Sequence, residues 1–100
     1  MTQDKDKVAC RTPNKDGKPT NIPRWKFDAV AAAIRDAVGR DGLAFADLPG
    51  AVGGRLGDDV RARLGSLGWH VTTVKLEMEV AGELERFARE GKQWLRLAGC

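Results

Sequence analysis

Residues 66–98 constrain the fold of this chain more than any other stretch. Residues with spacings of three and four place one apolar face on a helix, namely Val71, Val74, Met78 and Ala81. Ser66 or Gly68 is suited to open this helix, and Gly82 is suited to end it. We therefore predict a helix over about residues 69–81 that packs on another helix through Val71, Val74 and Met78.

The segment after Gly82 is typical of a β-hairpin. Residues 83–88 and 93–98 flank Arg89-Glu90-Gly91-Lys92, a turn of hairpin length that contains glycine. With Glu90-Gly91 at the tip, the facing residues are Leu84 and Leu97, Glu85 and Arg96, Arg86 and Leu95, and Phe87 and Trp94. One face of the hairpin is then aliphatic, and the other carries a Glu–Arg pair beside an aromatic pair.

The remaining residues supply the other elements of a small α+β domain. Apolar residues recur with helical period over residues 24–38, and Gly39 is placed to end that helix. Residues 43–45 are typical of a short edge strand, residues 47–52 of a short helix interrupted by Gly53-Gly54, and residues 57–65 of a further helix. Residues 1–22 predict an extended arm, docked through Val8 and Cys10, ahead of a domain at residues 23–98.

Composition limits the chain to one small soluble domain. It has 100 residues, of which 42% are hydrophobic and 31% charged, and no apolar run approaches the roughly 20 residues of a membrane helix. The charged N-terminus lacks the apolar stretch of a secretory signal, so we expect a cytoplasmic protein with no membrane partner. In that compartment Cys10 and Cys100 are expected to be free thiols.

Positive charge gathers near the two ends of the sequence. Residues 1–26 hold seven basic and three acidic side chains, and residues 86–97 hold four basic and one acidic. The intervening residues are net acidic. Basic segments of this kind can follow the phosphates of a nucleic acid, and they can equally be solvated ends of the chain.

The order helix, short strand, further helices and hairpin, with three to four helices in all, resembles winged-helix domains, a variant of the helix-turn-helix fold. The resemblance is carried by residues 71–86, in which a helix of apolar spacing ends at Gly82 and continues into Leu84 and Arg86. The chain is also similar to a small uncharacterised bacterial family through Gly68-Trp69, Thr72 to Leu76, Gly82 and Glu85-Arg86. The winged-helix resemblance implies duplex DNA as a partner, with the helix at residues 69–81, the third helix of that fold, in the major groove and the hairpin as the wing.

This resemblance gives candidate contacts for DNA on two elements. The helix residues expected to face outward are His70, Thr72, Thr73 and Lys75, and the hairpin residues expected to meet phosphates are Arg86, Arg89, Lys92 and Arg96. The helix also carries Glu77 and Glu79. Because DNA bears a negative charge about every 1.7 Å, these carboxylates argue against sequence readout. The hairpin arginines can also serve only solubility, with Glu85 paired to Arg96.

A second apolar strip on the same helix indicates a different class of function. Trp69, Leu76 and Val80 lie on the side opposite the first apolar face. Either the arm or the hairpin covers this strip within the monomer, or a homodimer or another protein does. The alternative to a weakly binding or partner-dependent transcriptional regulator is therefore a non-catalytic interaction module.

Catalytic, cofactor and metal sites are not indicated. The glycines at 50, 53, 54 and 57 do not match a phosphate-binding motif, and Glu77 and Glu79 are two apart on a helix and point in different directions. His70 is the single histidine, and no closely spaced cysteine pair accompanies it as a zinc ligand set. We expect no enzyme activity, no cofactor and no small-molecule substrate.

Overall fold

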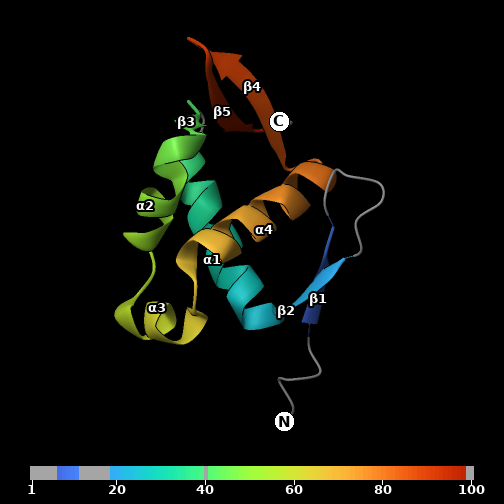
Figure 1. Ribbon diagram of the computed structural model, residues 1–100, viewed down its shortest axis with the longest axis vertical. Helices are drawn as coiled ribbons and strands as arrows, with labels where there is room; N and C mark the ends of the chain where they lie inside the picture. The colour runs from blue at the N-terminus through green and yellow to red at the C-terminus, as the bar shows by residue number, and fades with distance from the viewer. Residues whose placement is uncertain (1–6, 12–18, 40, 99–100) are drawn as a thin grey trace.

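The helices and sheets of this chain surround one apolar core. The computed structural model describes residues 7–11, 19–39 and 41–98 (Figure 1). Within these ranges it contains four α-helices, one 3-10 turn and two small antiparallel sheets. The chain is therefore a small, compact α+β domain, as its element pattern predicts. None of the described helices combines the length and the hydropathy needed to cross a bilayer.

Helix α1 (Arg24–Val38) is the platform on which the other helices rest. It starts after Pro23, whose φ of −54° suits entry into a helix, and ends at Gly39 with φ +59°. Val30, Ile34 and Val38 are spaced by four and are buried. Both limits match the predicted helix, because the apolar spacing and the terminal glycine are local signals.

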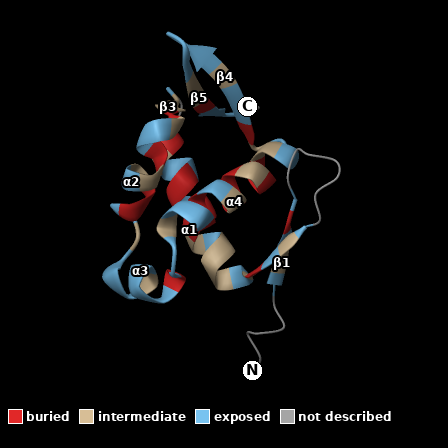
Figure 2. Ribbon diagram, viewed as in Figure 1, coloured by how far each residue is buried: buried red, intermediate tan, exposed pale blue. Residues whose placement is uncertain are grey.

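The middle of the chain forms short elements close to their predicted places. Strand β3 (Leu43–Ala44) leads into the 3-10 turn η2 (Phe45–Asp47) and helix α2 (Leu48–Gly53), and α3 (Asp58–Leu64) follows. Leu48, Val52 and Leu64 are fully buried and attach these elements to the core (Figure 2).

Helix α4 (Leu67–Val80) packs across α1 through the three residues predicted to make that contact. Val71, Val74 and Met78 have no exposed surface. The helix begins two residues before the predicted start, because the Ser66 hydroxyl accepts a hydrogen bond from the Trp69 amide at 3.2 Å. It ends as predicted: Gly82 has φ +84°, and the Glu83 amide donates to the Met78 carbonyl at 2.8 Å.

The C-terminal hairpin has the predicted register. Strands β4 (Leu84–Arg89) and β5 (Lys92–Leu97) pair Leu84 with Leu97, Glu85 with Arg96, Arg86 with Leu95 and Phe87 with Trp94. Glu90 and Gly91 form the tip with φ of +53° and +75°, which is the conformation of a two-residue hairpin turn. Strand β3 pairs with β5, so the sheet order is β3-β5-β4.

The N-terminal segment forms a ribbon of its own. Strand β1 (Lys7–Cys10) pairs antiparallel with β2 (Thr20–Pro23), and Cys10 and Ile22 reach the core. Val8 and Cys10 dock as expected, whereas pairing of the segment with itself was not predicted. The other residues of the predicted arm, 1–6 and 12–18, lie outside the described residues.

Gly42 lies in the turn just before β3, where the backbone closely approaches β5 of the hairpin. It has φ +89°, and a Cβ added there would lie 2.8 Å from the Leu95 carbonyl oxygen. Gly42→Ala should lower the free energy of unfolding by about 1–3 kcal/mol, measured by urea denaturation. The control is Gly50→Ala in α2, where an added Cβ meets nothing within 4 Å. Equal stability of the two variants would contradict this account.

Candidate interaction surface on the fourth helix and the hairpin

Helix α4 turns its charged side chains inward. Lys75 is 3% exposed and Glu77 is 8% exposed. The side chain of Glu79 is also 8% exposed. A helix at a protein surface normally turns such groups to water. Each of these side chains must therefore be neutralised by a partner within the fold.

Lys75 is held between an acidic side chain and an aromatic ring. Its Nζ lies 2.6 Å from Glu79 Oε2 and 4.6 Å from the centroid of the Phe45 ring. The first contact is ionic and not a directed hydrogen bond, because Glu79 Oε2 has no hydrogen-bond partner among the described residues. Glu79 Oε1 lies 2.9 Å from Arg86 Nε, so the same carboxylate joins α4 to β4.

Glu77 binds the N-terminal ribbon. Its Oε1 accepts hydrogen bonds from the Arg11 backbone amide at 2.7 Å and from Arg11 Nε at 3.0 Å. Its Oε2 accepts from Arg11 Nη2 at 2.6 Å. These hydrogen bonds lower the pKa of Glu77 below its usual range, although desolvation opposes the shift.

Burial, assisted by the negative charge of Glu77, raises the pKa of the neighbouring Cys10 thiol to about 11. Cys10 is a free thiol, as expected, whereas Cys100 lies outside the described residues.

His70 supports the start of α4. Its Nδ1 lies 2.7 Å from the Ser66 carbonyl oxygen, and because a carbonyl can only accept, Nδ1 carries the proton. The imidazole meets the Trp69 ring edge to face, with centroids 4.8 Å apart.

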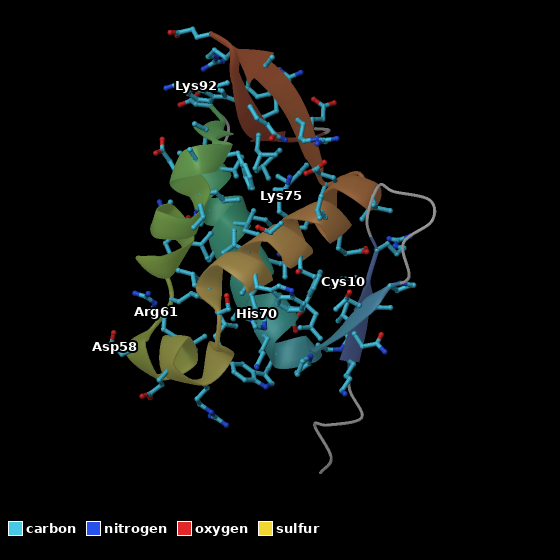
Figure 3. The ribbon with its side chains drawn as sticks, in the orientation of Figure 1. Cys10, Asp58, Arg61, His70, Lys75 and Lys92 are labelled. Atoms are coloured by element: carbon cyan, nitrogen blue, oxygen red, sulfur yellow. The ribbon has the colours of Figure 1, made fainter. Side chains whose placement is uncertain are left out.

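His70 and Lys75 therefore do not face outward, and that prediction is wrong. On a helix with 100° per residue, Lys75 lies about 40° from the buried Val71, and His70 lies at the edge of the buried face. The prediction gave more weight to the polarity of these side chains than to their angular position. Figure 3 places His70 toward the α3 end of α4 and Lys75 nearer the hairpin.

The outer face of α4 is uncharged. We define it by the residues on the side away from α1, which are Trp69, Thr72, Thr73, Leu76 and Val80. Trp69 is 47% exposed and Val80 is 37% exposed. Leu76 and Thr73 are half-buried, and Thr72 is exposed. All three residues of the predicted apolar strip thus lie on this face, together with the two threonines proposed for DNA.

The hairpin keeps its predicted basic residues exposed, but only two of the four lack an acidic partner. Arg86 is paired with Glu79, and Arg96 Nε lies 2.8 Å from Glu85 Oε1. Arg89 lies over the Trp94 ring at 4.4 Å, and neither it nor Lys92 pairs with a carboxylate among the described residues. The two hairpin cations without an acidic partner among the described residues therefore flank the tip, which also carries the exposed Glu90.

Two hollows lie beside the hairpin. One of 540 Å³ is lined by Ala44, Phe45, Ala46, Lys92 and Gln93. A shallower one of 320 Å³ is lined by Arg86, Phe87, Ala88, Gly91, Lys92 and Gln93. Among the described residues, neither lining includes a carboxylate, a histidine or a thiol. In the described part of the chain, no cluster of three or more histidine, cysteine or acidic residues could hold a metal ion.

Comparison with known proteins places this surface within a family. The model of DUF6958, a family of unknown function, matches residues 7–94. The chain belongs to this family. The DUF6958 match extends from β1 into β5, so the ribbon, α4 and its buried charges all lie inside the family region. No curated protein and no solved structure matches the chain.

The Glu77–Arg11 contact predicts a loss of stability in acid. Because the pKa of Glu77 is lower in the folded than in the unfolded chain, its contribution is complete above its unfolded pKa and is lost as the pH falls through its folded pKa. Glu77→Gln should lower the free energy of unfolding by about 1–2 kcal/mol at pH 7, and the difference from the wild type should shrink below about pH 4.

Urea denaturation across that pH range measures this effect. The matched control is Glu85→Gln, which removes an exposed ion pair with Arg96 and should cost less than about 1 kcal/mol. A difference between wild type and Glu77→Gln that stays constant from pH 7 to pH 3 would contradict the assignment.

Proposed function

We propose that this chain is a non-catalytic protein-association module that binds through the outer face of α4. In this proposal its scaffold is a winged-helix domain of the bacterial cytoplasm. The scaffold is supported by the element order and by the pairing of β3 with β5 beside the β4–β5 hairpin. The α4 helix then occupies the position from which winged-helix proteins usually enter the major groove of DNA.

The distribution of charge on α4 carries this proposal. Its only lysine and both of its glutamates are turned inward, while a tryptophan, a leucine and a valine are left on the outer face. A helix that binds DNA needs exposed donors and cations to meet phosphates and base edges. The outer face offers only two threonine hydroxyls and the indole N–H of Trp69 for that purpose, and its exposed indole is the kind of anchor that dominates protein interfaces.

Photo-crosslinking in cells tests the association. A benzophenone amino acid at Thr72 or Trp69 should give a covalent adduct with a protein, because these positions lie in the proposed interface. The matched control is the same amino acid at Ala32, an exposed position on α1, which should give no adduct. The absence of an adduct from both α4 positions would refute the proposal, and the mass of any adduct identifies the partner.

Duplex DNA is a second candidate partner, and the tip of the hairpin favours it. Arg89 and Lys92 are exposed and lack carboxylate partners in the described residues, so both are available to phosphates. In this second proposal the protein is a weak or partner-dependent transcriptional regulator. Its contacts are non-specific, because the α4 side chains proposed to read bases include the buried His70 and Lys75.

Salt dependence tests the DNA candidate. Random duplex DNA should bind at about 50 mM salt and lose most of its affinity at about 200 mM. The double variant Arg89→Ala/Lys92→Ala should reduce the slope of log affinity against log salt by about 2, because two phosphate contacts are lost. Arg55→Ala, which removes an exposed cation paired with Asp36, should leave the slope unchanged. Absence of binding at the lower salt would eliminate this candidate.

A further inference from the structure

The residue spacing on the outer face of α4 is the same when it is read in either direction along the helix. Four of its five residues, at positions 69, 73, 76 and 80, are spaced by four, three and four, a spacing with which two helices can pack along their length. Figure 1 shows α4 crossing in front of α1, with no other described element in front of it. Trp69 and Val80, near the two ends of this face, are the large hydrophobic residues of α4 that are exposed among the described residues.

We propose that the occupant of this face is a second copy of the chain, packed as an antiparallel pair of α4 helices about a two-fold axis. The inference rests on the proposed function and names its partner. In such a pair, facing residues have numbers that add to a constant. With a constant of 149, Trp69 faces Val80 of the second copy and Thr73 faces its Leu76.

Two criteria favour this register: the sizes of the facing side chains and the number of outer-face residues that it covers. Each facing pair joins one large side chain with one smaller one, so the two surfaces interdigitate without two large groups meeting. Shifting the helices by one turn, to a constant of 145, sets Val80 opposite Gly65 and leaves it uncovered. The register of 149 is thus the one that covers all four residues.

Electrostatics does not oppose the pair. Lys75, Glu77 and Glu79 are all turned toward the interior of their own chain, so the two-fold axis brings no like charges of the two α4 helices together. An antiparallel arrangement also sets the positive end of each helix dipole beside the negative end of the other. A glutamate or lysine introduced into this contact would have to be buried without a partner.

Sedimentation equilibrium of the full chain tests the inference. Under reducing conditions, from about 10 µM to about 500 µM, the wild type should pass from 10.9 kDa toward twice that mass. Leu76→Glu and Thr73→Lys, each measured alone, should raise the dissociation constant at least about tenfold. Ala32→Glu, an exposed change on α1, should leave it unchanged.

A charge-complementation experiment then tests the register. In a mixture of the two single variants, the glutamate at position 76 of one copy faces the lysine at position 73 of the other, so a mixed dimer should form more tightly than either variant alone. Thr73→Lys/Leu76→Glu in one chain should restore the homodimer. Leu76→Glu mixed with Thr73→Glu is the matched control and should not associate. Circular dichroism confirms that each variant is folded.

Three results would overturn the inference. They are a wild type that stays monomeric throughout the concentration range, a dimer that Leu76→Glu leaves intact, and a failure of the mixture and the double variant to restore association. The proposed function is judged separately, because a monomeric wild type whose Thr72 crosslinks to a different protein in cells refutes the second copy as occupant but not association through α4. A monomer without any crosslink refutes both.

Discussion

The inward charges of α4 are the constraint on which the rest of the structure depends. Lys75, Glu77 and Glu79 are withdrawn from water, and a buried charge is tolerated only beside a partner. Glu77 obtains its partner from the ribbon through Arg11, and Glu79 obtains a second one from the hairpin through Arg86. Helix α4 thereby fixes the positions of the β1–β2 ribbon and the β4–β5 hairpin, which apolar packing alone would position less specifically.

These ion pairs position elements more than they stabilise the fold. Replacing a buried pair by apolar residues is often neutral for stability, whereas removing one partner is costly, because a charge is left unneutralised. Lys75 illustrates this role. It lies between Glu79 and the Phe45 ring, so a single ammonium group ties α4 to the turn after β3. The three-stranded sheet and the helix are thus held in one arrangement by polar contacts around an apolar core.

This arrangement separates two surfaces of opposite character. The outer face of α4 is uncharged and centred on Trp69 and Leu76, while the hairpin tip carries Arg89 and Lys92. In the two proposals the first surface binds protein and the second binds phosphate, so one chain could hold both ligands without competition between them. A dimer through α4 would present two such tips, and linked sites gain affinity when both can be engaged at once.

The sequence by itself determined the elements whose signals are local. The limits of α1, the stop of α4 at Gly82, the register of the hairpin and the apolar strip at Trp69, Leu76 and Val80 all follow from periodicity and turn chemistry, which act over a few residues. The tertiary structure alone decided which partners the charged residues of α4 meet. Arg11 and Glu77 are 66 residues apart, and no local pattern predicts that they meet or that Lys75 is buried against Phe45. The pairing of β1 with β2 was likewise not predicted from the local sequence pattern and was decided by the tertiary structure. Charged side chains and strand edges meet their partners only when packing brings distant segments together. The residues that stay exposed for binding are therefore determined by the complete tertiary fold.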